Sequence, residues 1–326
     1  MKERILRHLR ENGGFVSGQE LCDELMVSRT AVWKVIHQLQ EEGYQIEAVR
    51  NKGYHLLDHA DILSQAELSA CLKDAGVLSE AVYCKEVDST NNYARQLAEQ
   101  GAGHGTVVVA ETQTAGKGRR GRGWVSPAGS AIYMSCILRP PIEPFQASAL
   151  TLVAAMAVER AISGMLDVRP LIKWPNDLII EGRKICGILT EMSSDMDGIH
   201  YVVVGIGINA NQMTFPEEIQ QVATSLALAS GKKVRRAALV AAIMNDLENY
   251  YQSFIKTADM SLLAESYNQK LVNCSKPVAV IEPAGTWMGR ALGINAQGEL
   301  MVEQEDGRIK NVLSGEVSVR GVYGYV

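Results

Sequence analysis

The chain has 326 residues, 47% of them hydrophobic and 21% charged, a composition that excludes a mostly disordered chain, a collagen-like chain and a coiled-coil rod. Its length corresponds to about two domains of ordinary size. A formal net charge of −5 excludes a globally basic nucleic-acid coat but leaves room for local basic patches.

Cysteine usage and the N-terminus indicate a cytoplasmic protein. The six cysteines, at positions 22, 71, 84, 136, 186 and 274, form no C-x-x-C pair, so neither a zinc ribbon nor a disulfide framework fits their spacing. Reduced thiols in the cytosol are the simpler interpretation. No apolar run follows the charged residues 2–4, and the apolar segment 149–162 is too short to cross a bilayer. We therefore expect no contact with a membrane and a buried helix at 149–162.

Residues 1–60 have the pattern of a winged helix-turn-helix domain. Apolar residues recur at helical spacing in 2–11, 18–25 and 29–41. Ser17 and Ser28 stand at N-cap positions, and Glu20 is placed to complete a capping box with Ser17. Two alternating strands, at 44–49 and 53–57, then enclose a basic turn, which predicts a β-hairpin wing.

The outer face of the third helix and the tip of the hairpin suit DNA. The second helix of a helix-turn-helix pair enters the major groove, and basic hairpin tips contact phosphates. Residues 1–58 carry eight basic and nine acidic side chains, so a solvated three-helix unit that binds a protein is the alternative. The candidate DNA-binding residues are Ser28, Arg29, Thr30, Trp33, Lys34, His37, Arg50 and Lys52.

After a short connector at 59–64, residues 65–272 combine buried strands with amphipathic helices. We expect helices at 67–75, 89–100, 147–166, 236–256 and 260–272, and strands at 81–87, 106–111, 131–139, 171–174, 177–180, 184–192 and 201–208. Because strands and helices do not alternate strictly, a mixed sheet covered by helices is predicted. Residues 273–326 show only four short strands, at 277–281, 287–294, 299–304 and 312–318, which indicates a small β-barrel or sandwich.

The segment 115–124 concentrates glycine and positive charge. Glycines let the backbone approach a ligand closely, and guanidinium groups bind phosphates and carboxylates through paired hydrogen bonds. Its cations are Lys117, Arg119, Arg120 and Arg122. No helix follows the G-x-G-x-x-G match at 116–121, which excludes a dinucleotide-binding fingerprint. A loop over a phosphate-bearing ligand is favoured, and a surface loop for nucleic acid is the alternative.

Two further groups of polar residues lie on either side of this loop in the sequence. Asp177 and Lys184 are placed to meet across a hairpin, either in a binding site or as an ordinary cross-strand salt bridge. Residues 88–91 begin a helix, where their side chains can serve as caps or contact a neutral ligand group such as a urea or amide. Gln113 and Asn209, at strand ends, suit the same neutral group. No H-E-x-x-H pattern and no nucleophile elbow occur, so we expect no resident metal.

Taken together, these motifs resemble those of the bacterial biotin–protein ligases. The matching stretches are Asp88-Ser-Thr-Asn91, the loop 116–124, Lys173-Trp-Pro-Asn-Asp177, Arg183-Lys184-x-x-Gly187 and Gly205-Ile-Gly-Ile-Asn209. The N-terminal winged helix matches the bifunctional type, which also represses the biotin operon. The resemblance covers essentially the whole chain. It implies an α+β multidomain protein with a winged helix-turn-helix at 1–60, a mixed-sheet α/β ligase core at 65–272 and an SH3-like β-barrel at 273–326.

The resemblance also implies a two-step reaction. Biotin and MgATP would give biotinyl-5′-AMP and pyrophosphate, and a lysine of a biotin carboxyl carrier protein would then take the biotinyl group. The adenylate would also act as corepressor, promoting a homodimer that binds operator DNA. A non-enzymatic ligand-sensing transcription factor and a lipoate-type ligase are the alternatives.

By position, the resemblance assigns roles to individual residues. Lys184, Arg119 and Asp177 would act in catalysis, with Asp177 orienting or deprotonating the acceptor lysine. Lys117 stands where arginine is commonest in the family, so it keeps the charge but lacks the guanidinium fork. The implied biotin- and adenylate-binding residues are Ser89, Thr90, Asn91, Gln113, Gly116, Lys117, Gly118, Arg119, Arg120, Arg122, Trp124, Lys184 and Asn209.

Overall fold

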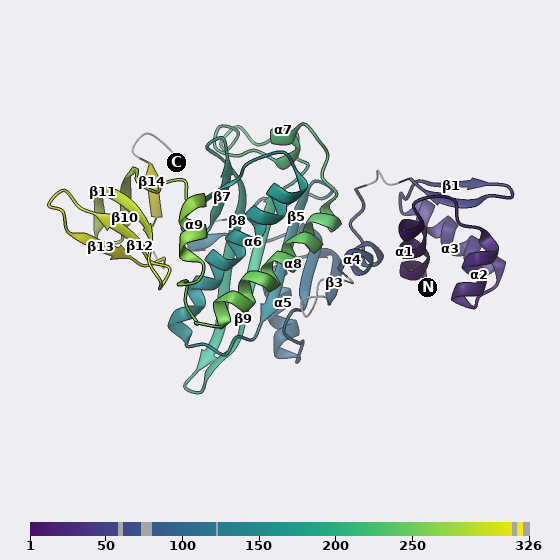
Figure 1. The fold of residues 1–326 in the computed structure, drawn as a ribbon, viewed down its shortest axis with the longest axis horizontal. Helices are drawn as coiled ribbons and strands as arrows, with labels where there is room; N and C mark the ends of the chain where they lie inside the picture. The colour runs from purple at the N-terminus through teal and green to yellow at the C-terminus, as the bar shows by residue number, and fades with distance from the viewer. Residues whose placement is uncertain (58–60, 73–79, 122, 315–317, 322–326) are drawn as a thin grey trace.

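The computed structural model describes residues 1–57, 61–72, 80–121, 123–314 and 318–321. The molecule is elongated, with a small helical unit at the N-terminal end, a larger α/β unit in the middle and a small β unit at the C-terminal end (Figure 1). This arrangement confirms the predicted α+β multidomain fold.

The N-terminal unit contains three helices and a hairpin: α1 (Lys2–Asn12), α2 (Gly18–Leu25), α3 (Arg29–Glu41), β1 (Ile46–Val49) and β2 (Gly53–Leu56). The predicted caps are present, because Ser17 Oγ accepts from the Glu20 amide at 3.1 Å and Ser28 Oγ accepts from the Ala31 amide at 3.2 Å. The Glu20 carboxylate does not complete the capping box and instead accepts from the Asn12 amide at 3.4 Å. A winged helix-turn-helix results, with its own buried apolar cluster.

A seven-stranded mixed sheet forms the middle of the protein, in the order β3-β4-β5-β9-β8-β7-β6. Its strands are β3 (Ala81–Val87), β4 (Val107–Gln113), β5 (Ala131–Leu138), β6 (Leu171–Lys173), β7 (Asp177–Ile180), β8 (Arg183–Asp195) and β9 (Gly198–Asn209). Strands β3 and β4 are parallel, and the other neighbours pair antiparallel. Strand β4 extends two residues beyond the predicted end at 111, so Gln113 belongs to the sheet.

Helices cover both faces of this sheet. They are α4 (Gln65–Leu72), α5 (Thr90–Glu99), α6 (Leu150–Met165), α7 (Leu226–Ser230), α8 (Arg236–Ile255) and α9 (Ala264–Lys270), with 3₁₀ turns η1 (Arg119–Gly121) and η2 (Pro144–Ala149). Because successive strand residues point to opposite faces, Val107 and Val109 pack with α6 and α8 whereas Val108 packs under α5. The sheet is therefore the middle layer of three (Figure 1).

The structure corrects several predicted helix bounds. The segment predicted as one helix at 147–166 begins as η2 and becomes α-helical at Leu150, and α9 is shorter than the predicted 260–272. Helix α7 was missed because five residues are too few for a helical period. Pro144–Met165 is long and apolar enough to span a membrane, but 72% of its most apolar window is buried inside the protein, as expected of a core helix.

The C-terminal unit is an antiparallel sheet in the order β13-β12-β11-β10-β14, which matches the expected SH3-like β-domain. Its strands are β10 (Pro277–Glu282), β11 (Gly285–Ile294), β12 (Leu300–Glu303), β13 (Ile309–Val312) and β14 (Ser318–Gly321). The predicted strand at 312–318 was wrong at 313–314, which follow the end of β13 and are not in a strand, and its residues 315–317 lie outside the described residues. Edge strand β13 is exposed at three of its four residues, so it has no hydrophobic alternation to reveal it.

Candidate active site

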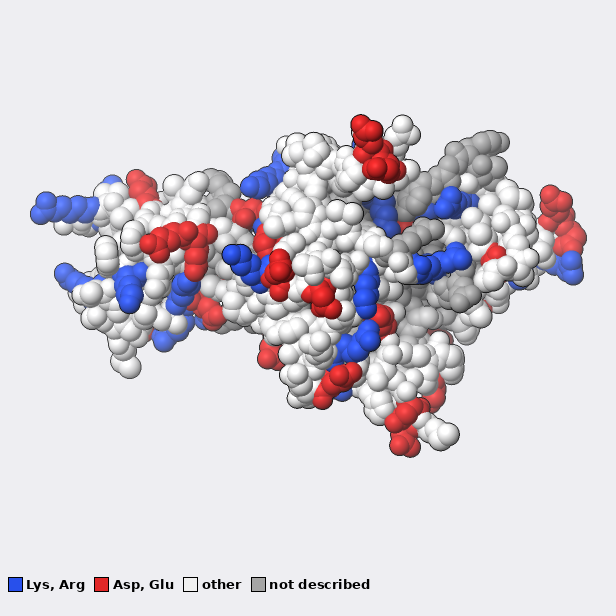
Figure 2. Space-filling view, turned by 180° about the vertical axis from the view of Figure 1, so that it is seen from behind, with Lys and Arg blue, Asp and Glu red and all other residues white. Residues whose placement is uncertain are grey.

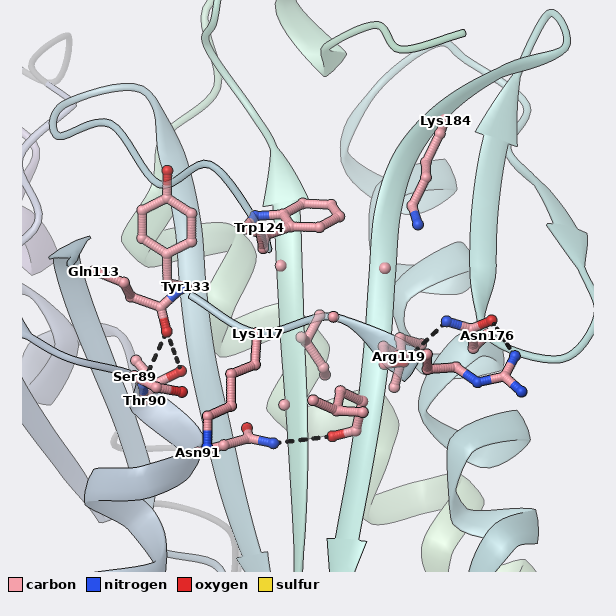
Figure 3. Close-up of a pocket in the computed structure, with 17 residues that line it drawn as sticks. Ser89, Thr90, Asn91, Gln113, Lys117, Arg119, Trp124, Tyr133, Asn176 and Lys184 are labelled. Carbon is pink, nitrogen blue, oxygen red and sulfur yellow. Dashed lines mark hydrogen bonds between the residues drawn. The ribbon is translucent and has the colours of Figure 1, made fainter. Parts of the chain in front are cut away.

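A cavity lies between the central sheet and the loop 114–130, which connects β4 to β5 (Figure 3). The cavity brings together most of the residues expected to bind ligand. Its lining consists of Ser89, Thr90, Asn91, Gln113, Lys117, Gly118, Arg119, Trp124, Tyr133, Asn176, Lys184, Gly187, Ile188, Leu189, Gly205, Ile206 and Gly207.

One end of the cavity carries neutral hydrogen-bonding groups from the start of α5 and the end of β4. Gln113 Oε1 accepts from the Thr90 amide at 2.8 Å and from its hydroxyl at 3.1 Å, and both side chains are visible together in Figure 3. Asn91 Nδ2 donates to Glu191 Oε2 at 2.7 Å. Ser89 is the N-cap residue of α5 and is 2% exposed, yet its side chain makes no cap hydrogen bond. Its hydroxyl is therefore not used as a cap, which favours the ligand-binding interpretation of 88–91.

Glycines of β8 and β9 form the floor of the cavity. A Cβ atom on Gly205 would lie 2.0 Å from Asn91 Oδ1, and one on Gly207 would lie 2.9 Å from Trp124 Cε2. A Cβ on Gly187 would likewise meet Trp124 Cζ3 at 2.9 Å. The glycine spacing in these strands lets Asn91 and the Trp124 ring lie directly against the sheet. The sequence motifs contained these glycines, but only the strand pairing reveals that they share one floor.

The other end of the cavity is cationic. Lys184 Nζ lies 2.6 Å from Asp177 Oδ1 and 5.3 Å from the centre of the Trp124 ring. Arg119 Nη1 donates to Asn176 Oδ1 at 2.9 Å, and Arg119 Nη2 donates to the Ser314 carbonyl at 2.5 Å. Burial lowers the pKa of Arg119 below its ordinary value, and the nearby Asp177 carboxylate opposes that shift. Two cations from different elements thus converge beside one carboxylate.

The Asp177–Lys184 contact is not a simple pair of opposed residues. Asp177 is opposite Gly187 and Lys184 is opposite Ile179, and the register shifts between positions 178 and 179. Lys184 lines the cavity, whereas Asp177 is not in the lining and reaches it only through its contact with Lys184. Both remain partly exposed, at 26% for Lys184 and 14% for Asp177, so a ligand can reach them.

Three of the described residues that were expected to bind ligand are not in the lining. Asn209 Nδ2 instead donates to the Thr224 carbonyl at 3.1 Å and to the Lys184 carbonyl at 3.4 Å. A Cβ atom on Gly116 would lie 2.4 Å from the Trp124 carbonyl oxygen, so Gly116 serves the close packing of the loop. Arg120 is exposed, with a φ of 59°. Arg122 lies outside the described residues.

Sequence reasoning did not single out Tyr133 and Asn176, which also line the cavity. Asn176 lay inside the Lys173–Asp177 motif, whereas Tyr133 lay in a strand whose residues are all buried, so no periodicity marked it. Lys173 from the same motif is 5% exposed, and burial lowers its pKa to about 8. Among the described residues, no group of three or more His, Cys, Asp or Glu side chains could hold a metal ion.

The winged helix exposes all the candidate DNA-binding side chains, on α3 and at the hairpin tip. The Trp33 ring is 58% exposed and stacks on His37 with 5.4 Å between ring centres. Lys52 Nζ lies 5.7 Å from the centre of the Phe15 ring. Over the face of the molecule seen in Figure 2, basic and acidic side chains are interspersed, in agreement with the low net charge.

Three family models match the chain in sequence order. The model described as "HTH domain" matches residues 2–55, "Biotin/lipoate A/B protein ligase family" matches residues 83–209, and "Biotin protein ligase C terminal domain" matches residues 274–320.

Curated relatives match along nearly the whole chain. The bifunctional ligase/repressor BirA of Bacillus subtilis is 41% identical over 309 residues, covering 94% of each protein. The protein of the same description from Escherichia coli is 32% identical over 313 residues, covering 96% of this chain and 95% of that protein. Among solved structures, biotin protein ligase from Aquifex aeolicus in complex with biotin and ATP superposes with a TM-score of 0.66 at 32% identity, covering 74% of this chain and 99% of that one.

Proposed function

The chain belongs to the biotin/lipoate A/B protein ligase family, among its bifunctional ligase/repressors, and on that premise we propose that it ligates biotin to a carrier protein and represses transcription. One observation carries the enzymatic part. Two cations, Lys184 and Arg119, converge with Asp177 at one end of a cavity whose other end offers neutral hydrogen-bonding groups. A carboxylate with a polar, uncharged head, which is the chemistry of biotin, fits between those ends.

Binding places the neutral ureido group of biotin at the end formed by Ser89, Thr90, Asn91 and Gln113. Ser89 offers a hydroxyl that caps no helix, and Gln113 is held in place by Thr90 and by Ser126 Oγ at 3.0 Å. Such preorganised partners bind a ligand without a large cost in side-chain ordering. The carboxylate of biotin then points toward Lys184 and Arg119.

The first chemical step joins two anions, biotin and MgATP. A carboxylate oxygen attacks the α-phosphorus, the bond to the β-phosphate bridging oxygen breaks, and biotinyl-5′-AMP and pyrophosphate result. Lys184 and Arg119 offset the charge that builds up in this step. Mg²⁺ enters as part of the ATP substrate complex. Trp124 borders the adenylate, and the loop 114–130 excludes the water that would hydrolyse it.

The second step transfers the biotinyl group to a lysine of a biotin carboxyl carrier protein. The lysine amine attacks the acyl carbon, the bond to the phosphate oxygen breaks, and AMP leaves. The amine must be uncharged to attack, and Asp177 is the nearest carboxylate to orient it or accept its proton. Asp177 must separate from Lys184 to do so, which the arrival of the negatively charged adenylate promotes.

Repression is the second activity of the same chain. Biotinyl-5′-AMP acts as corepressor by strengthening a homodimer, which places two winged helices on two half-sites of operator DNA. The residues proposed to contact that DNA are those exposed on α3 and at the hairpin tip, from Ser28 to Lys52. The proposed domain boundaries are 1–60, 65–272 and 273–326, and the proposed location is the cytoplasm.

A single experiment tests the ligase. The protein is mixed with biotin, MgATP and a purified carrier domain, and the mass of the carrier is measured. We expect one biotinyl group on one lysine and no gain without ATP. A carrier that gains lipoate in preference to biotin identifies a lipoate-type ligase. No gain, together with no biotin-dependent ATP–pyrophosphate exchange, identifies a non-enzymatic ligand sensor.

The repressor activity is tested by selection from a random DNA pool with biotinyl-5′-AMP present. We expect a two-fold symmetric sequence to be enriched, and we expect the enrichment to be lost when the adenylate is omitted. Recovery of no symmetric sequence under either condition contradicts the proposal.

A further inference from the structure

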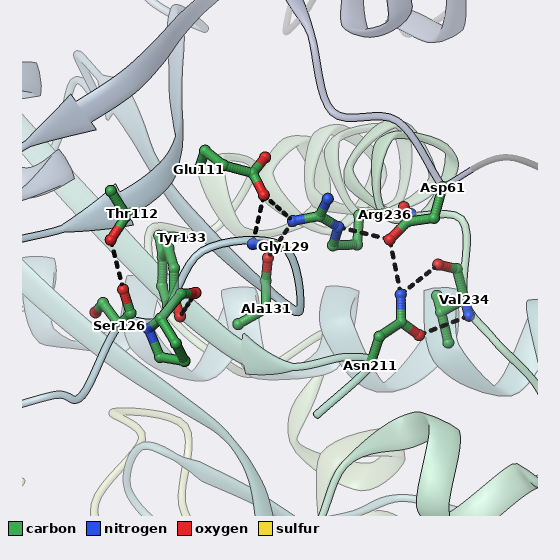
Figure 4. Close-up of polar contacts among 11 residues, drawn as sticks. Asp61, Glu111, Thr112, Ser126, Gly129, Ala131, Tyr133, Asn211, Val234 and Arg236 are labelled. Carbon is green, nitrogen blue, oxygen red and sulfur yellow. Dashed lines mark hydrogen bonds and ion pairs between the residues drawn. The ribbon is translucent and has the colours of Figure 1, made fainter. Parts of the chain in front are cut away.

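A buried carboxylate in the connector between the winged helix and the catalytic core makes contacts far outside its own segment (Figure 4). The Asp61 side chain is 2% exposed. It accepts from the Arg236 amide at 2.9 Å, from Arg236 Nε at 2.8 Å and from Asn211 Nδ2 at 2.8 Å. These partners lie at the start of α8 and just after β9, so Asp61 ties the connector into the core.

The start of α8 is unusual for a helix of 20 residues. Its N-cap residue is Arg235, its first helical residue is Arg236, and its first turn contains no acidic side chain. Positive charge at a helix N-terminus opposes the helix dipole, and arginine is a poor N-cap. Asp61 supplies the missing acceptor and negative charge from 175 residues away in the sequence. The helix therefore depends on the connector for its cap.

Arg236 connects Asp61 to the loop over the cavity. Its Nη1 donates to Glu111 Oε1 at 2.9 Å and to the Ala131 carbonyl at 3.2 Å. Glu111 Oε1 in turn accepts from the Gly129 amide at 2.6 Å. Burial alone would lower the pKa of Arg236, but the carboxylates of Asp61 and Glu111 raise it above its ordinary value. Gly129 lies at the end of loop 114–130, which bears Lys117, Arg119 and Trp124, and Ala131 is the first residue of β5.

A parallel contact reaches the same loop end through Asn211. The Asn211 amide donates to the Ser130 carbonyl at 2.5 Å while its side chain bonds Asp61. Both routes from Asp61 thus finish within residues 129–131. The adjacent Arg235 lies 3.6 Å from Glu67, which also pairs with Arg10 of α1 and accepts from the Tyr44 hydroxyl at 3.0 Å. The winged helix is held at the same corner of the core.

From these contacts we infer that Asp61 and Arg236 are positioning residues for the ligand loop. The connector carboxylate, through Arg236, Glu111 and Asn211, fixes the end of loop 114–130 in the position that retains biotinyl-5′-AMP. This inference rests on the proposed function, because the retained ligand is the product of the first step. Removing one partner of a buried ion pair destabilises a fold, so the test must separate a positioning role from a loss of stability.

The test measures the release of biotinyl-5′-AMP from the full chain. Asp61→Asn removes the charge with little change in volume, and Arg236→Lys keeps the charge but cannot bridge Asp61 and Glu111. We expect release to accelerate by about tenfold in both variants, with the maximal rate of pyrophosphate exchange changed less than about threefold. The double variant Asp61→Asn with Glu111→Gln should release no faster than the faster single variant, since both act through Arg236.

Glu159→Gln is the matched control. Glu159 is also a buried carboxylate in an ion pair, 2.9 Å from Lys270 Nζ, but it lies on α6 away from the loop. We expect it to lower the melting temperature comparably and to leave release unchanged. Hydrogen exchange of the segment 124–130 in the adenylate complex should accelerate only in the Asp61 and Arg236 variants.

The inference is overturned if Asp61→Asn and Arg236→Lys release biotinyl-5′-AMP, and exchange hydrogen in 124–130, at the wild-type rates. It is also overturned if Glu159→Gln accelerates that release as much as they do. If the variants fail to fold, hydrogen exchange on the wild type decides. The 129–131 amides should then be protected together with the Asp61 connector on adenylate binding, and protection confined to 114–121 contradicts the inference. A wild-type protein that forms no adenylate refutes the proposed function instead.

Discussion

Lys184 Nζ lies 2.6 Å from Asp177 Oδ1, although the two residues are not opposite one another in the β7–β8 ladder. The register shifts between positions 178 and 179, Lys184 lines the cavity, and Asp177, which is not in the lining, lies beside Lys184. This contact holds together the lysine proposed to act in adenylation and the carboxylate proposed to accept the amine proton. Substituting each residue should therefore slow a different chemical step.

Asp177→Asn should slow transfer to the carrier more than adenylate formation. General-base contributions are about 10²–10⁴-fold, so we expect a loss in that range for transfer and less than about tenfold for pyrophosphate exchange. Single-turnover transfer from preformed adenylate measures the first quantity. Asp306→Asn, in an exposed turn, is the control. Equal losses in both steps would contradict the assignment of Asp177 to transfer.

Lys184→Met should have the opposite pattern. Loss of a positive charge that offsets two anions is expected to reduce biotin-dependent pyrophosphate exchange by about 10²-fold or more, with the fold intact. Transfer from added biotinyl-5′-AMP should fall less. The rate of biotin-dependent pyrophosphate exchange and the melting temperature are both measured. An unchanged rate of pyrophosphate exchange in a folded variant refutes the role of Lys184.

Gly205→Ala should weaken biotin binding. The new Cβ would lie 2.0 Å from Asn91 Oδ1, so Asn91 must move and its hydrogen bond with Glu191 is disturbed. We expect the KM for biotin to rise by about tenfold, which corresponds to about 1.4 kcal/mol. Gly164→Ala in helix α6 is the control, because nothing lies within 4 Å of its added Cβ. A normal KM for Gly205→Ala would show that Asn91 is not needed at the biotin end.

Lys173 should make stability depend on pH. Burial lowers its pKa to about 8 from the ordinary 10.5, so the unfolded chain binds more protons between these values. The free energy of unfolding should therefore increase as the pH rises from 8 to 10.5. Below pH 8 Lys173 is charged in the folded protein, and this buried charge destabilises the fold. Lys173→Met should remove that dependence and raise stability at pH 7 by about 1–3 kcal/mol.

Urea unfolding of wild type and Lys173→Met at several pH values measures the difference between them. Lys276→Met, at an exposed position, is the control and should leave the pH dependence as in wild type. A constant difference between wild type and Lys173→Met from pH 7 to pH 10 would contradict the predicted titration.

Lys52→Gln should weaken operator binding without affecting ligation. Loss of one phosphate contact reduces the slope of log affinity against log salt by about one and acts equally on specific and random DNA. Lys256→Gln, at the C-cap of α8, removes the same single positive charge far from the hairpin and serves as the control. An unchanged salt slope for Lys52→Gln would place the hairpin tip away from the phosphates.

The sequence by itself determined the local features of this protein. Helical spacing around Ile5, Leu6 and Leu9, the caps Ser17 and Ser28 and the basic hairpin turn were enough for the winged helix, because these signals act over a few residues. The glycine and arginine loop and the Lys173–Asp177 motif likewise marked two segments that contribute residues to the cavity lining. The edge strand β13 and the short helix α7 were not predicted, because neither buries enough apolar residues to produce a hydrophobic period in the sequence.

Only the tertiary structure decided which of these residues meet. Strand pairing put Gly187, Gly205 and Gly207 under Asn91 and Trp124. Asn209 is not in the cavity lining, and its side chain instead bonds the Lys184 carbonyl. The contact of Asp61 with Arg236 joins residues 175 positions apart and leaves no pattern in the sequence. Hydrogen bonds of that kind depend on where whole elements pack, and packing is settled by the shared core of the sheet and its helices rather than by local spacing.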